Sequence, residues 1–309
     1  MNIQGELRKG TLFQNLELLA KQVVEGFISG IHKSPFHGFS AEFAEHKIYN
    51  TGESTKHIDW KLYGKTDKLY TKRYEEETNL RCHMILDNSA SMYYPEYKEL
   101  SLEKLNKIGF GVLAIAALMQ VLKKQRDAVG LSIYSDTYSY YTPEKGSERH
   151  HQMLLAKLNE VSKDPQPAAE TKTYTFLHQI AEKLKRRSLV FLFTDMFQNA
   201  WEDDKLFDAL RHLKYNKHEV VIFHLLDAET ELDFNFENTP KRFFDVETGK
   251  HIDLYADSIK DAYQQEVSAF IEKLKLTCAK YKIKYVTVDV RDDFSKVLNT
   301  FMIERQTFG

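Results

Sequence analysis

The chain has 309 residues and a formal net charge of -2. A balance this close to neutral excludes a global field that recruits nucleic acid or an anionic membrane surface, so we expect neither a nucleic-acid partner nor membrane insertion. Two cysteines are too few for a disulfide framework, and no apolar run reaches the length of a membrane span. We therefore expect a cytoplasmic protein with reduced, buried thiols.

The first 79 residues predict a small N-terminal part ahead of a larger domain of residues 80–309. Apolar residues recur at helical spacing between Thr11 and Ile31, which predicts an amphipathic helix that packs on the main body. Residues 36–77 mix aromatic, basic and acidic side chains with short apolar runs only. They predict a small β-rich or irregular layer, in which we expect Trp60 to be a core residue.

From residue 80 onward, strand patterns alternate with helix patterns. Strands are predicted at 80–86, 128–134, 138–141, 189–194, 220–226 and 284–290, with a hairpin at 243–255. Helices are predicted at 102–122, 147–161, 205–215, 257–281 and 294–305, and another ends near Arg187. This alternation predicts an α/β fold with a mostly parallel sheet, right-handed crossovers and helices on both faces.

The stretch LRCHMILDNSASM, residues 80–92, indicates a binding site. A short apolar strand ends on Asp87, and Ser89 and Ser91 follow it. In open α/β sheets, ligands bind at the carboxyl ends of strands. A carboxylate and two hydroxyls are hard oxygen donors of the kind that Mg²⁺ accepts, so they predict half of a divalent-cation site. The alternative is that these side chains only cap the following segment.

The other half of the site is expected on loops at the same edge. Asp195 ends a second continuous apolar strand, and Thr171, Thr173 and Thr175 precede or open a predicted helix. An oxygen-only set with several neutral hydroxyls leaves the cation electron-poor, so it accepts a carboxylate from a partner. This favours metal-bridged binding over hydrolysis, which needs a general base aimed at water.

Other reaction classes lack their signatures. The chain has no GxxxxGK[ST], no GxGxxG after a strand and no GxSxG elbow. His150 and His151 are adjacent, so they point to different sides of a helix instead of forming a zinc pair, and we expect them on the surface. The competing hypothesis is a Mg²⁺-dependent phosphoesterase that uses Asp87 and Asp195. A further carboxylate close to the metal would favour it, and the candidates are Glu170 and Asp136.

Two motifs resemble known families. Residues 87–92 (DNSASM) are similar to the metal-ion-dependent adhesion site of von Willebrand factor A domains, whose first element is DxSxS. Residues 49–61 (YNTGESTKHIDWK) resemble the signature YxxGDDxRxIDWK of the bacterial domain of unknown function 58 family. Glu53, Ser54 and Lys56 depart from that signature, which bears on the ionic pairing of this segment. The resemblance implies a von Willebrand factor A-like (Rossmann-like) fold.

The resemblance also implies a complete set of ligands. In the family, a threonine opens a helix, a leucine follows six residues later and the second aspartate about 24 residues later. Thr171 fits this spacing, with Leu177 and Asp195, and Thr173 is the alternative. The implied ligands of Mg²⁺ or Mn²⁺ are Asp87, Ser89, Ser91, Thr171 and Asp195.

The family context implies partners as well. Members are linked with MoxR-type AAA+ ATPases and other A-domain proteins, in the assembly or activation of target complexes. By that resemblance, the chain is expected to be a non-enzymatic adaptor whose metal grips an acidic residue of a protein partner.

Overall fold

The computed structural model describes residues 15–31, 46–48, 60–72, 80–97, 100–135, 139–161, 173–196, 203–237, 239–244 and 251–308. The chain divides into two compact units. Gly30–Asn79 forms the small unit, and Met1–Ser29 joins Leu80–Gly309 in the large one. Helix α2 (Leu16–Ile31) buries Leu16, Leu19 and Val24 in the core of the large unit, as its amphipathic pattern predicts.

The described part of the small unit holds two short strands and one helix. Strand β1 (His46–Ile48) pairs antiparallel with β2 (Tyr70–Lys72), and α3 (Trp60–Thr66) lies between them in sequence. Trp60 is 64% exposed, so the expectation that it is a core residue is wrong. Its ring contacts only the edge of Tyr63, with centroids 6.2 Å apart, among the described rings. A helix of 7 residues and a two-stranded ribbon offer little surface on which to bury an indole.

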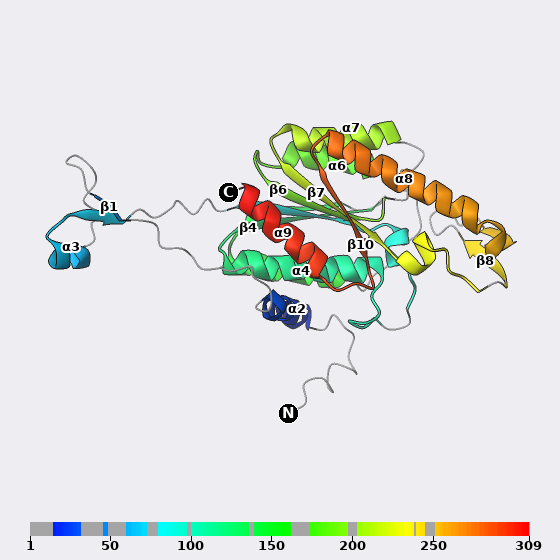
Figure 1. The fold of residues 1–309 in the computed structure, drawn as a ribbon, viewed down its shortest axis with the longest axis horizontal. Helices are drawn as coiled ribbons and strands as arrows, with labels where there is room; N and C mark the ends of the chain where they lie inside the picture. Colours follow the sequence, from blue (N-terminus) through cyan, green and yellow to red (C-terminus); the bar gives the residue numbers. More distant parts are fainter. Residues whose placement is uncertain are drawn as a thin grey trace, which may run out of the picture. The chain divides into compact units, whose positions relative to one another are not determined.

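The large unit is built on a six-stranded sheet with the order β10-β7-β6-β3-β4-β5 (Figure 1). All neighbouring strands are parallel except β4 and β5. The strands are β3 (Arg81–Asp87), β4 (Ala128–Tyr134), β5 (Ser139–Lys145), β6 (Leu189–Thr194), β7 (Glu219–Leu226) and β10 (Lys284–Asp289). The predicted α/β fold with a mostly parallel sheet is confirmed.

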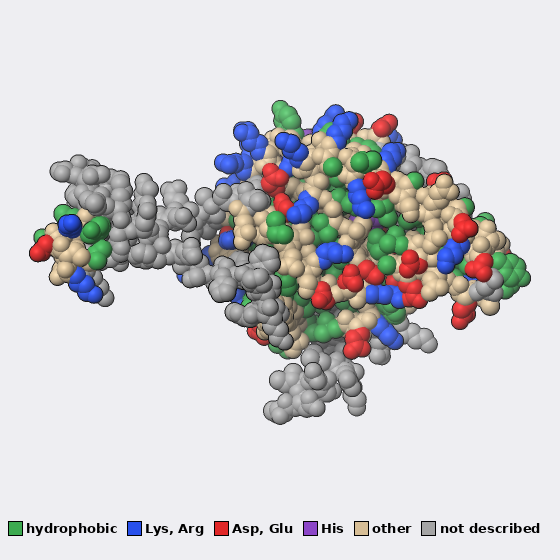
Figure 2. All heavy atoms as spheres, viewed as in Figure 1, with side chains coloured by type: hydrophobic (Ala, Val, Ile, Leu, Met, Phe, Trp, Pro, Cys, Tyr) green, Lys and Arg blue, Asp and Glu red, His purple; other side chains and the backbone are tan. Residues whose placement is uncertain are grey.

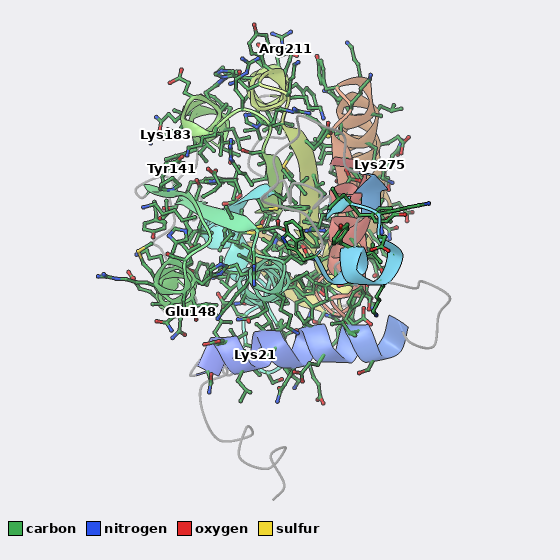
Figure 3. The ribbon with its side chains drawn as sticks, turned by 90° about the vertical axis from the view of Figure 1, so that its left-hand side faces the viewer. Lys21, Tyr141, Glu148, Lys183, Arg211 and Lys275 are labelled. Atoms are coloured by element: carbon green, nitrogen blue, oxygen red, sulfur yellow. The ribbon has the colours of Figure 1, made fainter. Side chains whose placement is uncertain are left out.

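Helices cover both faces of this sheet, and successive side chains along a strand pack into the hydrophobic cores on its opposite faces. Met84 and Leu86 pack into one core and Ile85 into the other, because side chains alternate along a strand. The first core lies under α4 (Lys107–Lys124), α5 (Glu148–Val161) and α9 (Ser295–Phe308). The second lies under α6 (Thr173–Lys183), α7 (Asp203–Tyr215) and α8 (Lys260–Lys280). Figure 3 shows α6 and α7, labelled at Lys183 and Arg211, on the side of the sheet away from α2 and Lys21.

Most predicted elements appear within a few residues of their expected ends. Helix α4 begins later than expected because the Asn106 side chain accepts a hydrogen bond from the Gly109 N–H at 2.9 Å and caps the helix there. The expected hairpin is present as β8 (Pro240–Phe244) and β9 (His251–Tyr255), and its turn lies outside the described residues. Among the described helices, none combines the length and apolar character that crossing a membrane requires.

The two adjacent histidines were expected on the surface, and this expectation is wrong. His150 and His151 are 5% and 2% exposed. Helix α5 packs against α4, and His150 Nε2 lies 2.8 Å from the carbonyl oxygen of Val129. For His150, this hydrogen bond replaces one to water that a buried imidazole loses, so burial of the His150 ring is compatible with its polarity.

A polar network crosses the sheet from β3 to its edge strand β5. His83 Nδ1 lies 2.7 Å from a Glu144 oxygen and its Nε2 lies 2.7 Å from the Ser132 hydroxyl. Burial raises the pKa of Glu144, but the hydrogen bond and charge of His83 outweigh it and leave the pKa lowered. Gly130 makes room for the imidazole: a Cβ there would lie 2.5 Å from His83 Nδ1 and 2.9 Å from the Thr142 carbonyl oxygen.

Gly130→Ala is expected to destabilise the fold by roughly 1–3 kcal/mol, because the added methyl overpacks a buried network and meets backbone. Gly26→Ala is the matched control. No atom lies within 4 Å of a Cβ at Gly26, so this exposed helical position should gain about 0.5–1 kcal/mol. Urea unfolding of the two variants checks the contrast, and equal effects would contradict it.

Candidate metal centre

Successive strands are placed first on one side of β3 and then, from β6 onward, on its other side. From β3 the chain proceeds through β4 to β5 on one side, and β6, β7 and β10 follow on the other (Figure 1). In open α/β sheets, such a switch point leaves a crevice at the carboxyl ends of the strands. Asp87 ends β3, and Asp195 follows β6 directly. The structure thus brings the two predicted aspartates to neighbouring strand ends.

Asp87 is buried and heavily hydrogen-bonded. Its Oδ2 accepts hydrogen bonds from the Thr194 hydroxyl at 2.6 Å and the Tyr134 hydroxyl at 3.1 Å, and its Oδ1 accepts one from the Ser89 N–H at 3.0 Å. Burial first, and then the charge of Asp195, raise its pKa to about 6 against the opposing effect of these hydrogen bonds. The carboxylate is therefore ionised above that pH, at an electrostatic cost that a nearby cation would relieve.

Ser89 and Ser91 present their hydroxyls next to each other. Both residues are buried, and their Oγ atoms lie 3.2 Å apart. Ser89 occupies the N-cap position of the short 3₁₀ turn Ala90–Tyr93, yet its side chain makes no capping hydrogen bond. The alternative that these side chains only cap the following segment therefore explains the hydrogen bond from the Ser89 N–H to Asp87. It does not explain why the two serine hydroxyls lie next to each other.

Asp195 is paired with a lysine that the sequence did not single out. Lys107 Nζ donates to Asp195 Oδ2 at 2.9 Å and to Glu231 Oε1 at 2.7 Å. Burial opposes ionisation of Asp195, but the Lys107 ammonium outweighs it and lowers the pKa. Among the described residues, Asp195 Oδ1 has no hydrogen-bond partner. The sequence offered one signal for this ion pair, which is a lysine at the start of the very apolar helix α4.

Glu231 reaches the same place from an unpredicted π-helical turn, η6 (Ala228–Leu232). The turn is fixed at its start, because Glu231 Oε2 accepts the Asp227 N–H at 2.7 Å and Arg291 donates to Asp227 at 3.1 Å. Arg291 also pairs with Glu229. Figure 2 shows acidic side chains gathered around this part of the surface, with single basic side chains between them.

A threonine of the loop before α6 was expected at the site. Thr173 is the first residue of α6, is 1% exposed, and its hydroxyl interacts with the Tyr134 hydroxyl that donates to Asp87. Burial raises the pKa of Tyr134, so its hydroxyl stays protonated and remains a donor. Thr175 is exposed. Three other expected positions lie outside the described residues: Thr171, Glu170 and Asp136.

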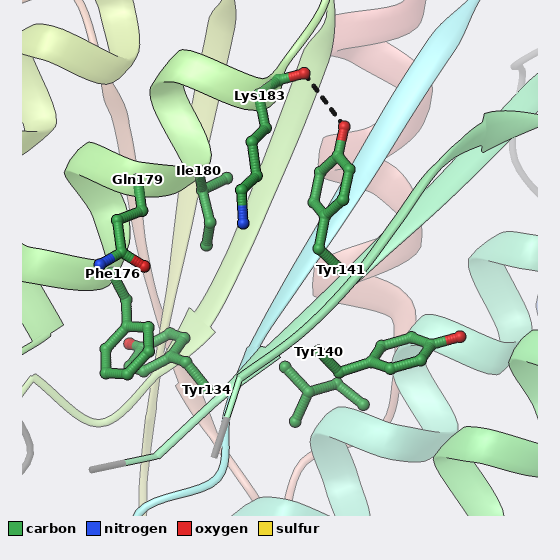
Figure 4. A pocket seen from close by; sticks show the side chains of 8 residues that line it. Tyr134, Tyr140, Tyr141, Phe176, Gln179, Ile180 and Lys183 are labelled. Atoms are coloured by element: carbon green, nitrogen blue, oxygen red, sulfur yellow. Dashed lines mark hydrogen bonds between the residues drawn. The ribbon is translucent and has the colours of Figure 1, made fainter. Parts of the chain in front are cut away.

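Tyr134 also forms the wall of a pocket of about 170 Å³ between β5 and α6 (Figure 4). Its ring stacks on Phe176 with centroids 5.5 Å apart, and Tyr141 donates to the Lys183 carbonyl oxygen at 3.0 Å. The pocket is lined by Ile133, Tyr134, Tyr140, Tyr141, Phe176, Gln179, Ile180 and Lys183. These side chains include no carboxylate, imidazole or thiol, so the pocket's chemistry is aromatic and distinct from that of the oxygen-rich edge.

The donor set at the edge fits a hard divalent cation. Among the described residues, no group of three or more His, Cys, Asp and Glu side chains is placed to hold a metal, so a cation at this place would also need the hydroxyls as ligands. Hydroxyl and carboxylate oxygens suit Mg²⁺ or Mn²⁺ better than softer ions. When ionised, the carboxylates of Asp87, Asp195 and Glu231 against one Lys107 ammonium leave two negative charges, which equals the charge of one such cation.

Comparison with known sequences identifies relatives of the chain. Residues 45–271 match the family described as "Protein of unknown function DUF58". Uncharacterized proteins of Mycobacterium bovis and Mycobacterium tuberculosis are 22% identical to the chain over 152 residues. The match covers 49% of this chain and 46% of each relative, so the chain spans about half the length of the curated relatives it matches.

Similar solved structures include BatB, a conserved hypothetical protein from Bacteroides thetaiotaomicron. It is 15% identical, with a TM-score of 0.44, over 74% of this chain and 100% of that one. The SpRpn10 VWA domain is 11% identical, with a TM-score of 0.36, over 72% of this chain and 94% of that one. Both likenesses concern only the arrangement of helices and strands.

A buried histidine next to the site predicts a pH effect on stability. His224 on β7 contacts the Tyr285 hydroxyl, and burial lowers its pKa to about 4. Since the folded state binds the proton more weakly than the unfolded chain, the contribution of neutral His224 is complete above about pH 6.5 and is lost as the pH falls toward 4.

In unfolding experiments between pH 7 and pH 4, His224→Leu should therefore flatten the loss of stability seen for the wild type. His251→Leu, at an exposed position on β9, serves as the control and should leave the slope unchanged. Parallel curves for wild type and His224→Leu would contradict the assignment.

Proposed function

We propose that this chain, which belongs to the DUF58 family of proteins of unknown function, is a protein-interaction module that binds through a divalent metal ion. Mg²⁺ or Mn²⁺ would be held by Asp87, Ser89, Ser91, Asp195 and a threonine, either Thr171 or Thr173. When bound, the metal supplies a positive centre that accepts a carboxylate from a partner protein.

The observation that carries this proposal is a cluster of buried hydroxyl and carboxylate oxygens in which one carboxylate oxygen lacks a hydrogen-bond partner among the described residues. The hydroxyls of Ser89 and Ser91 face each other without capping the following turn, and Asp195 Oδ1 has no hydrogen-bond partner among the described residues. Buried polar atoms are normally satisfied, so the unpaired oxygen of Asp195, at the strand ends where such sheets bind ligands, supports a ligand at this place.

The same contacts disfavour the alternative of a Mg²⁺-dependent phosphoesterase. Hydrolysis needs a general base within reach of a water molecule. Asp87 is engaged by three donors, Asp195 by Lys107, and Glu231 by both Lys107 and the Asp227 N–H. Glu231 is a further carboxylate near the centre, which favours the phosphoesterase, but it and the two aspartates are all held by other groups, so none of the three is left to act as a general base. A non-enzymatic role follows more directly from this arrangement.

The identity of the partner rests on the family resemblance. A MoxR-type AAA+ ATPase and other A-domain proteins are the partners we propose, with the chain acting as a cytoplasmic adaptor in the assembly or activation of a target complex. The chemistry of the site requires only that the partner present an acidic side chain to the metal.

Asp87→Asn is expected to weaken Mn²⁺ binding by at least about tenfold, or ~1.4 kcal/mol. At pH 8, the wild-type carboxylate is ionised because its pKa is about 6, and the amide removes that charge. The amide also places an NH2 donor among groups that donate to Asp87, so the stability of the metal-free variant is compared with that of the wild type by urea unfolding. Calorimetric titration with Mg²⁺ and Mn²⁺ measures the loss, and Asp253→Asn, in an exposed ion pair, is the control.

The same titrations, repeated with a short glutamate-rich peptide, test the partner's carboxylate. Binding of the metal should tighten with this peptide and not with its glutamine counterpart. Equal metal binding by wild type and Asp87→Asn, or no saturable binding by the wild type, would overturn the proposed function.

The two threonines are distinguished by a pair of valine substitutions. Thr173→Val should weaken Mn²⁺ binding more than Thr171→Val, because the buried Thr173 hydroxyl belongs to the network of Tyr134 and Asp87. Valine keeps the volume and removes only the hydroxyl. The opposite order would assign the ligand role to Thr171, as the spacing of the family motif implies.

A further inference from the structure

Lys107 occupies a position that is unfavourable for a cation. It is the first residue of α4, after the N-cap Asn106, where the helix dipole presents partial positive charge. Its side chain is 1% exposed, although lysine is almost never buried in full without a partner. Burial alone would lower its pKa, yet the charges of Asp195 and Glu231 outweigh burial and raise it. The ammonium therefore persists in the interior.

This ion pair is costly and is poorly explained by stability. Replacing a buried ion pair by apolar groups of similar volume is often neutral or stabilising, whereas removing one partner leaves an uncompensated charge. Lys107 joins three elements: α4, the end of β6 through Asp195, and η6 through Glu231. A lysine in this place ties the candidate metal centre to the η6 turn.

We propose that Lys107 competes with the divalent cation for Asp195 and thereby sets how tightly the centre holds its metal. The inference rests on the proposed function, because it concerns the same site. Lys107 is a positioning residue: it acts on the metal through the Asp195 carboxylate.

The competition follows from the bonding of one carboxylate. Lys107 donates to Asp195 Oδ2, while Oδ1 has no partner among the described residues. A cation drawing on Asp195 shares its charge with the ammonium and is repelled by it, in an interior where charges are poorly screened. The protein alone therefore binds metal weakly. A carboxylate supplied by a partner adds negative charge next to the cation and offsets the repulsion by Lys107, so metal and partner bind together.

The test is a Mn²⁺ titration of wild type, Lys107→Met and Lys123→Met at pH 8. Lys123, at the far end of α4, forms an ion pair of 2.6 Å with Glu148 and is partly exposed. Both variants lose one positive charge, so they differ only in the place on α4 from which the charge is removed. Lys107→Met should bind Mn²⁺ at least about tenfold more tightly than wild type, and Lys123→Met should match the wild type.

Thermal unfolding provides a readout that does not depend on affinity alone. Without metal, Lys107→Met leaves Asp195 and Glu231 uncompensated and should melt below the wild type. Mn²⁺ should raise its melting temperature more than that of the wild type. A lysine with a merely structural role would lower the melting temperature equally with and without Mn²⁺, and that result would overturn the proposal.

The double variant Lys107→Met/Glu231→Gln separates direct competition from net charge. It removes one charge of each sign, so the local balance is kept and folding is protected, while Asp195 loses its lysine. It should still bind Mn²⁺ more tightly than the wild type, and it decides the question if Lys107→Met alone does not fold. Unchanged or weaker binding overturns the competition.

The outcomes also separate this inference from the proposed function. If the wild type binds Mn²⁺ and removal of Lys107 changes nothing, the inference fails and the metal centre stands. If the variants without Lys107 bind Mn²⁺ and the wild type binds it neither alone nor with the glutamate-rich peptide, the inference holds and metal-dependent function of the wild type fails. If no protein binds Mn²⁺, both fail.

Discussion

Two buried carboxylates at neighbouring strand ends are the constraint on which this structure depends. Asp87 and Asp195 both lose hydration, and each opposes ionisation of the other. The fold answers with hydroxyl donors for Asp87, from Thr194 and Tyr134, and with a buried ammonium for Asp195. These groups come from β6, β4 and α4, so three separate elements of the large unit stabilise the two buried carboxylates.

The topology explains why the two carboxylates are buried at this place. Successive strands are added on one side of β3 and then on the side of β6, and Asp87 and Asp195 lie at the carboxyl ends of these two strands, where such sheets bind ligands. Both layers of helices contribute to the surroundings of the two aspartates: α4 provides Lys107 and α6 provides Thr173. Polar groups that would be costly within the sheet are concentrated at the carboxyl ends of its strands, where a charged ligand would offset their desolvation.

The sequence predicted the sheet well because its central strands are continuous apolar runs that end on charged residues. It placed Asp87 and Asp195 for the same reason. It missed the pairing of Lys107, because its partners lie 88 and 124 residues away and no local pattern connects them. The burial of His150 was missed for the same reason, because the carbonyl oxygen that its ring contacts belongs to Val129, in another element. Contacts that depend on tertiary neighbours are invisible to spacing rules, whereas periodicity and strand ends are local.

The network of His83, Gly130 and Glu144 bears on how one edge of the sheet resists pairing with a further strand. Strand β5 lies at an end of the sheet, and its pairing with β4 shifts register between Val129 and Leu131, around Gly130. An inward-facing Glu144 and a bulge are devices by which natural sheets discourage edge-to-edge aggregation. A slip of one residue would turn Glu144 outward and remove the partner of His83. The network thus selects a single alignment for one of the two edge strands of the sheet.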